Sequence, residues 1–276
     1  DAMHDLDGLG FEKDILNRFE DMLIGGEGII LVSGPTGSGK TTTLYSTLNK
    51  MDNPDVNIVT IEDPIEYDLD NINQAQVNRR SGVTFASALR AILRQDPDII
   101  MVGEVRDEET VELAIRAALT GHLVFSTIHT NDSASGFTRL LNWGMEPFLI
   151  TSTVKGILSQ RLVRKLCKEC REKHMVEPSE LIKFGLEVDE PIEFYKGVGC
   201  LSCRNTGYQG RVGLFELIRM NNDIADLVME QKPGHVIRQK AIEYGMFSLL
   251  HDGLIKAQRG ETSLQEIVET LGTDTI

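Results

Sequence analysis

Gly34-Pro35-Thr36-Gly37-Ser38-Gly39-Lys40-Thr41 is the stretch that decides the fold. It fits the pattern G-x-x-x-x-G-K-[ST] at every position. Such a turn lets backbone N–H groups converge on phosphate oxygens, and the positive end of a following helix points at the same place. Lys40 would neutralise the β- and γ-phosphates, and the Thr41 hydroxyl would ligate Mg²⁺. We assign Gly34 to Thr41, together with the adjacent Thr42, to nucleotide binding.

The flanking residues supply the context that this motif requires, which disfavours a chance glycine-rich turn. Apolar runs predict buried strands, and helical patterns separate them. We expect strands at 28–32, 56–62, 98–103 and 123–130, and helices at 40–51, 84–95 and 107–119. This alternation predicts an α/β fold with a parallel-rich central sheet covered on both faces.

The character of the chain changes along its length, which suggests four segments. Residues 1–25 form a lead-in that ends in an amphipathic helix. Residues 26–163 carry the strand and helix alternation of the nucleotide-binding core. Cysteine, glycine and polar residues dominate 164–213, and 214–276 is expected to be a helical C-terminal region.

Acidic residues follow two of the expected strands. Ligands of an open parallel sheet bind beyond the carboxyl ends of its strands, where both Glu62 and Glu104 fall. Gly103 stands where an aspartate is common, so Glu104 is expected to serve the magnesium ion. Glu62 is then the better candidate to orient or deprotonate the attacking water. The alternative for Glu62 and Asp63 is a solvated turn before Pro64.

Two histidines bracket the last expected strand of the core. His129 lies at its carboxyl end, where it could hydrogen-bond the γ-phosphate, although a core or turn histidine is an equal alternative. His122 precedes the strand, and its residues alone favour a core or turn role.

Four cysteines form two C-x-x-C pairs, Cys167/Cys170 and Cys200/Cys203, with twenty-nine residues between them. Two such pairs can complete a tetrahedral Cys₄ site, which suits zinc or an iron–sulfur cluster. We favour a closed, structural zinc site over a redox C-x-x-C, because two redox pairs would have to coincide. The intervening residues 175–196 should form a small excursion of their own.

Charge and hydropathy narrow the class of protein further. The 28 basic and 42 acidic residues give a formal net charge of −14, which disfavours direct nucleic-acid binding. No apolar run reaches the roughly eighteen residues of a membrane span, and the acidic start is unlike a signal peptide. We therefore expect a cytoplasmic protein with reduced cysteines.

Taken together, four ordered boxes resemble the type II/type IV secretion ATPase superfamily. They are GPTGSGKTTT (34–43), IEDPIEY (61–67), LRQDPDIIMVGEVRD (93–107) and TGHLVFSTIHTND (120–132). The stretches QRLVRKLC (160–167) and GRVG to Glu216 also match. The cysteines point to the branch that is GspE-like or PilB-like, since PilT-like retraction ATPases generally lack them.

The resemblance implies a RecA-like core in a homohexameric ring that uses ATP and Mg²⁺. Hydrolysis would drive pilin or pseudopilin assembly at the inner face of the inner membrane, with platform and adaptor proteins as partners. It implies a catalytic role for Glu62, a magnesium role for Glu104, and positions near the nucleotide for His122 and His129. Arg211 would approach the nucleotide from the C-terminal part.

Family members also carry an N-terminal domain whose arginines reach a nucleotide in the ring. We expect this chain to start after that domain, and hence to bind ATP or ADP but to hydrolyse ATP slowly. Arg79, Arg80 and Arg94 are local candidates for the missing arginines, although a solvated surface role suits each better.

Two other functions remain open at this point. A nucleic-acid motor also combines a phosphate loop with zinc, but the −14 charge argues against it. A nucleotide-sensing interaction module would not need a water-positioning acid such as Glu62. Pilus assembly and type II secretion are not distinguished by these residues.

Overall fold

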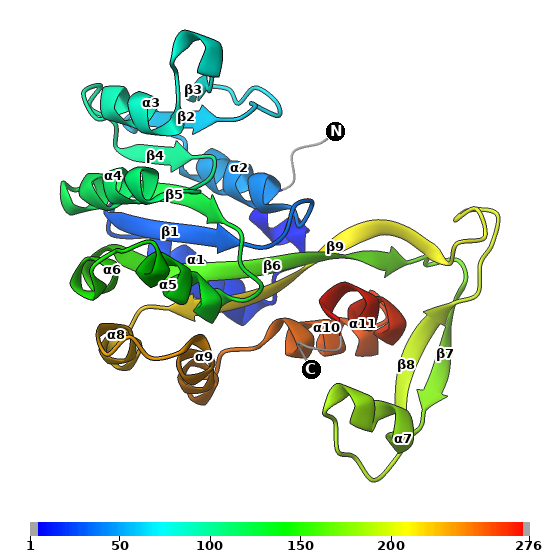
Figure 1. Ribbon diagram of the computed structural model, residues 1–276. Helices are drawn as coiled ribbons and strands as arrows, with labels where there is room; N and C mark the ends of the chain where they lie inside the picture. The colour runs from blue at the N-terminus through cyan, green and yellow to red at the C-terminus, as the bar shows by residue number, and fades with distance from the viewer. Residues whose placement is uncertain (1–4, 273–276) are drawn as a thin grey trace.

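The computed structural model describes residues 5–272, which form a twisted central sheet between layers of helices (Figure 1). The sheet has seven strands in the order β3-β2-β4-β5-β1-β6-β9. All neighbouring pairs are parallel except β6 and β9. The predicted α/β class with a parallel-rich sheet is therefore confirmed. The strands are β1 (Gly28–Ser33), β2 (Ile58–Glu62), β3 (Asn73–Gln76), β4 (Ile99–Val102), β5 (Leu123–Ile128), β6 (Val154–Leu166) and β9 (Tyr208–Arg219).

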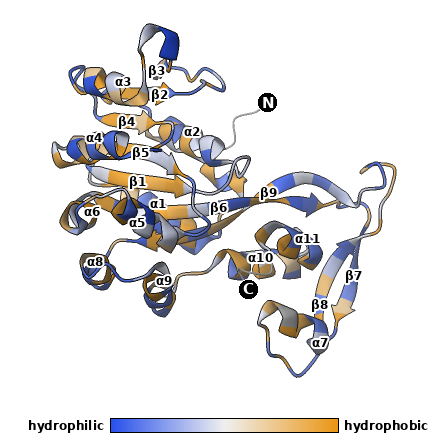
Figure 2. Cartoon of the chain, viewed as in Figure 1, coloured by the Kyte–Doolittle hydropathy of each residue, from blue (hydrophilic) through white to orange (hydrophobic). Residues whose placement is uncertain are grey.

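Helices cover both faces of the sheet because its central strands are apolar on both sides (Figure 2). Ile30 and Val32 of β1 pack on the side of α1 (Lys13–Leu23) and α2 (Lys40–Met51). Ile29 and Leu31 pack on the opposite side. The helices of that side are α3 (Phe85–Ile92), α4 (Glu108–Leu119), α5 (Ser133–Asn142), α6 (Pro147–Thr153), α8 (Asn222–Met229) and α9 (Gly234–Glu243).

The helix starts agree with the capping signals in the sequence. Thr84, at the start of α3, accepts a hydrogen bond from the Ser87 N–H, and the Ser87 hydroxyl oxygen accepts one from the Thr84 N–H. The Asp107 side chain caps α4 by accepting from the Thr110 N–H. Two 3₁₀ turns, η1 (Leu6–Leu9) and η2 (Arg79–Ser81), complete this part of the chain.

Three strands of the central sheet were not expected from the sequence. β3 has the polar sequence Asn-Gln-Ala-Gln and lies at the sheet edge, so no apolar run marks it. β6 and β9 carry charged residues because their outer halves extend beyond the layered core (Figure 1). The boundaries drawn at 163/164 and 213/214 fall inside these two strands, and residues 214–219 are strand rather than helix.

A small lobe extends from the outer ends of β6 and β9 (Figure 1). It contains the antiparallel pair β7 (Arg171–Val176) and β8 (Ile192–Gly197), with α7 (Pro178–Leu181) and the 3₁₀ turn η3 (Ile182–Phe184) between them. This lobe is the predicted excursion between the cysteine pairs. None of the helices within residues 5–272 is long and apolar enough to cross a bilayer.

The last two helices, α10 (Leu249–Gln258) and α11 (Leu264–Leu271), pack against β9 and β6. A buried ion pair on α10 holds β9. Lys256 Nζ lies 2.6 Å from Asp252 Oδ2 and donates a 2.8 Å hydrogen bond to the Gly213 carbonyl. Asp252 Oδ2 also accepts from the Phe215 N–H. Burial raises the pKa of Asp252, and the Lys256 ammonium opposes that rise.

We expect Lys256→Met to destabilise the protein by about 3–5 kcal/mol, because it leaves the Asp252 carboxylate buried without its partner. Urea unfolding followed by circular dichroism measures the loss. Arg116→Met is the matched control, since it removes an exposed pair with Glu112 and should cost less than about 1 kcal/mol. Equal costs for the two variants would contradict a structural role for the buried pair.

Candidate functional site

The glycine-rich loop lies between β1 and α2, at the carboxyl edge of the parallel sheet. The Gly34 N–H donates to the Ile128 carbonyl at the end of β5. Lys40 Nζ donates to the carbonyls of Gly34 (2.9 Å) and Pro35 (2.8 Å). Burial lowers the pKa of Lys40, and the nearby Glu104 carboxylate opposes that shift.

A pocket of about 420 Å³ opens beside this loop. That volume lies within the range of small-ligand sites. The pocket joins the loop to both predicted acids, to His129 and to Arg211, so the structure brings these candidates together. Gly34, Pro35 and Ser38 form the loop but are not among the residues that line the pocket. The lining includes Thr36, Gly37, Gly39, Lys40, Thr41, Thr42, Glu62, Asp63, Glu104, Arg106, His129, Leu162 and Arg211.

Glu62 ends β2 and is 2% exposed. Its Oε1 accepts hydrogen bonds from Thr60 Oγ1 (2.6 Å) and Gln74 Nε2 (3.1 Å). Its Oε2 accepts from the Tyr45 hydroxyl. Burial and this bond to Glu62 raise the pKa of Tyr45. Three donors from three elements therefore hold one carboxylate in a single orientation at the pocket wall, unlike a solvated turn.

Glu104 follows β4 and contacts two basic side chains. Arg106 Nη2 lies 2.6 Å from its Oε1, and His129 Nε2 lies 3.4 Å from its Oε2. Space is tight at Gly103, where an aspartate is common. A Cβ there would lie 3.2 Å from the Ile61 carbonyl oxygen and 3.3 Å from Glu62 Cα, so the neighbouring backbone would have to shift to accept a side chain.

His122 does not line this pocket, so the nucleotide role that the family resemblance implied for it stays a prediction. It lies at the amino end of β5, and its carbonyl accepts from the Gly28 N–H where β1 begins. The pocket lies at the other end of both strands. The His122 ring nitrogen Nδ1 is 2.8 Å from the Ala117 carbonyl, so the contacts are those of a turn histidine.

Of the arginine candidates, one lines the pocket and three lie on the exposed surface. Arg211 on β9 lines the pocket, as expected. Arg79 pairs with Asp63 at 3.2 Å and is largely exposed, while Arg80 and Arg94 are exposed and do not line this pocket. The three therefore have the solvated surface positions that their residues suggested.

Several residues of the site were missed by sequence reasoning. Tyr45 and Gln74 hold Glu62, Arg106 pairs with Glu104, and Gln160 contacts the loop from β6. Arg106 had a usable signal, since it follows Glu104 by two residues, and Gln160 begins the matching stretch 160–167. Tyr45 and Gln74 lie 17 and 12 positions from Glu62, and no motif marked them for the site.

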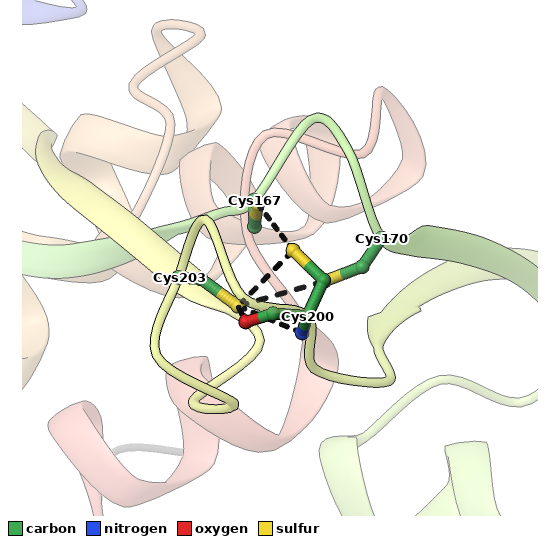
Figure 3. Close-up of side chains that lie close together, drawn as sticks. All are labelled: Cys167, Cys170, Cys200 and Cys203. Atoms are coloured by element: carbon green, nitrogen blue, oxygen red, sulfur yellow. Dashed lines mark hydrogen bonds between the residues drawn. The ribbon is translucent and has the colours of Figure 1, made fainter.

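The four cysteines meet where β6 and β9 join the small lobe (Figure 3). Their sulfur atoms all lie within 4.8 Å of one another. Sγ–Sγ distances are 3.8 Å for Cys167–Cys200, 3.8 Å for Cys170–Cys203 and 3.7 Å for Cys200–Cys203. Tetrahedral Zn–S bonds of about 2.3 Å place sulfurs about 3.8 Å apart. The cluster therefore fits one tetrahedral ion, and its sulfurs are too far apart for disulfides.

The cysteines of this cluster differ in their pKa values: burial raises the pKa of Cys170 to about 12, whereas backbone groups favour thiolate at Cys203. Burial opposes ionisation of Cys203, but the N–H groups of Cys200 and Gly207 each donate to its Sγ at 3.2 Å. These donors lower the pKa of Cys203 to about 6. Thiolate is the form that binds metal.

A glycine-rich loop after a buried strand, a helix that begins at its lysine, and carboxylates at neighbouring strand ends define a P-loop nucleotide-binding protein. The chain belongs to the family described as type II/IV secretion system protein, whose model matches residues 1–269.

Relatives of two kinds match at similar identity. The chain is 47% identical over 266 residues to the type IV pilus assembly ATPase PilB of Thermus thermophilus, covering 96% of this chain and 30% of that protein. It is 46% identical over 264 residues to the type II secretion system ATPase E of Vibrio cholerae, covering 96% and 52%. The chain thus spans about a third to a half of these relatives.

A solved structure of the pilus retraction motor PilT with bound ADP is similar in fold. Its TM-score is 0.72 at 31% identity, and the match covers 97% of this chain and 67% of that one. A structure of the Legionella pneumophila ATPase DotB matches with a TM-score of 0.71 at 25% identity, covering 96% and 64%.

We expect one zinc ion per chain by elemental analysis, and Cys200→Ser to lose it. Without the ion, the lobe around β7 and β8 should become sensitive to protease, while the core that contains β1 and α2 stays folded. Ser202→Ala, in the same turn, is the control and should keep the metal. If neither a chelator nor the change Cys200→Ser alters the metal content and the protease pattern, the cysteine cluster is not a structural metal site.

Proposed function

We propose that this chain is the motor portion of an ATPase that hydrolyses ATP to power the assembly of pilin or pseudopilin subunits. The observation that carries the proposal is a single pocket that holds both a phosphate-binding loop and two carboxylates from neighbouring strand ends. A site that only bound nucleotide would need the loop but no acid directed at water. The oriented Glu62 adds a group that can act on water.

The roles follow from the contacts. Backbone N–H groups of the loop and Lys40 would hold the β- and γ-phosphates, and Lys40 would leave its carbonyl partners to do so. Thr41 and Glu104 would hold Mg²⁺, which neutralises phosphate charge when bound. Glu62, fixed by Thr60, Gln74 and Tyr45, would orient or deprotonate the attacking water.

His129 and Arg211 complete the proposed site. His129 Nε2 contacts Glu104 and lines the same pocket, so it is suited to respond to the γ-phosphate through that carboxylate. Arg211 adds positive charge to the pocket from β9. Asp63 and Arg106 also line the pocket, which therefore carries charges of both signs.

We extend the proposal to the assembly in which such a motor works. Relatives named as pilus assembly and type II secretion ATPases match almost equally well, so the proposal covers both systems. We propose a RecA-like core that functions in a homohexamer in the cytoplasm, held at the inner membrane by platform and adaptor proteins. The net charge of −14 supports protein rather than nucleic-acid partners.

The cysteine cluster is proposed as a structural zinc site. All four ligands would come from the protein, which leaves no open position for chemistry. Its place at the junction of β6, β7, β8 and β9 supports a role in holding the lobe to the core. The proposed module, residues 164–213, then includes the outer ends of β6 and β9 as well as the lobe.

Glu62→Gln should reduce ATP turnover by about a hundredfold or more. The change removes the carboxylate that would orient the attacking water or accept its proton. The affinity for ATP with Mg²⁺ should stay within about threefold of wild type, since the loop is unchanged. Phosphate release and equilibrium nucleotide binding measure the two effects separately.

Glu112→Gln, an exposed change on α4, is the matched control and should leave both quantities unaltered. An equal loss of turnover and nucleotide binding in Glu62→Gln would make Glu62 structural. Turnover that rises on addition of DNA or RNA would favour the nucleic-acid motor instead.

A further inference from the structure

Gln160 on β6 contacts the phosphate-binding loop through its side-chain amide. Its side chain is buried, at 2% exposure, and uses both ends of its amide. Nε2 donates to the Ser38 carbonyl at 2.7 Å, and Oε1 accepts from Thr43 Oγ1 at 2.8 Å. Because a carbonyl can only accept, the contact with Ser38 fixes which end of the amide is the nitrogen.

This contact orients a peptide group of the loop. The carbonyl of Ser38 and the N–H of Gly39 belong to one planar trans peptide, so they point in opposite directions. When Gln160 holds the carbonyl on the β6 side, the Gly39 N–H is directed away from β6. Gly39 itself lines the pocket.

The packing leaves little freedom for this arrangement. Gly39 has a φ of 86°, and a Cβ there would lie 2.8 Å from Gln160 Nε2. A Cβ on Gly34 would lie 2.5 Å from the backbone carbonyl oxygen of Gln160. Two glycines of the motif therefore let the loop approach β6 closely enough for the amide to reach Ser38. The hydrogen bond to Thr43 ties the same amide to the first turn of α2.

We infer that Gln160 is a positioning residue for nucleotide binding: its amide holds the Ser38 carbonyl against β6 and so directs the Gly39 N–H toward the phosphates of the nucleotide. The inference rests on the proposed function, because it concerns the same pocket. It assigns to β6 a part in the nucleotide site that the sequence motif alone does not contain.

The test uses the 276-residue chain and ADP with Mg²⁺, with affinity measured by calorimetry between pH 6 and pH 8. Gln160→Met keeps the side-chain length but removes both hydrogen bonds, and should weaken ADP binding about tenfold at every pH. Gln160→Glu should weaken it at least as much at pH 8, because an ionised carboxylate cannot donate to the Ser38 carbonyl and repels phosphate.

The pH dependence of Gln160→Glu separates positioning from packing. Burial raises the pKa of a carboxyl group, and its protonated form can donate to Ser38 again. Affinity relative to wild type should therefore recover severalfold as the pH falls from 8 to 6. The elements that adjoin this side chain are α2, β6 and β9, and their charged groups are common to all variants. These groups are Lys40, Lys50, Lys155, Arg161, Arg164, Lys165, Arg211, Glu216 and Arg219.

Gln239→Glu, an exposed change on α9, is the matched control and should bind ADP like wild type at each pH. Wild-type protein that does not bind ADP would overturn the proposed function. Wild-type binding together with unchanged affinity in Gln160→Met and Gln160→Glu would overturn only the inference. If circular dichroism finds either Gln160 variant unfolded, Thr43→Val replaces it as the test. This variant frees the oxygen end of the Gln160 amide and should weaken ADP binding about threefold. Unchanged ADP affinity in Thr43→Val would also overturn the inference.

Discussion

A trans peptide directs its N–H away from its carbonyl, so the partners of the carbonyls in residues 34–39 help to set where the N–H groups of the loop point. Gln160 holds the Ser38 carbonyl, and Lys40 holds the carbonyls of Gly34 and Pro35 when it is not turned to phosphates. The Gly34 N–H is fixed on β5. The loop therefore depends on β1, β5 and β6 lying side by side, and this pairing is the constraint on which the site rests.

The same pairing assembles the acids. Parallel strands end at one edge of the sheet, so Glu62 after β2 and Glu104 after β4 meet the loop after β1. Two carboxylates in one pocket repel each other unless cations or donors intervene. Arg106 contacts Glu104, whereas neutral donors surround Glu62. The two acids thus have different surroundings, which matches their different proposed roles.

β6 and β9 connect this site to the rest of the molecule. β6 carries Gln160 and Leu162 beside the loop and ends one residue before Cys167. β9 carries Arg211 at the pocket and follows the second cysteine pair. Beyond the layered core, the strands pack on a separate apolar cluster, to which they contribute Val163, Val212 and Leu214. The cysteine cluster and the buried residues under α10 and α11 hold the outer parts of β6 and β9 in position.

The sequence by itself determined what depends on neighbouring residues: the phosphate loop between strand and helix, the acids at strand ends, the cap at Thr84, and cysteine pairs spaced for one ion. Only the tertiary structure decided which distant side chains surround them. Gln160 reaches Thr43 across 117 positions, and Tyr45 reaches Glu62 from another element. The tertiary structure also placed His122 at the amino end of β5, away from the pocket, and joined β9 to β6. The reason is physical, because strand pairing and side-chain burial depend on contacts between residues far apart in the chain, and no local pattern encodes them.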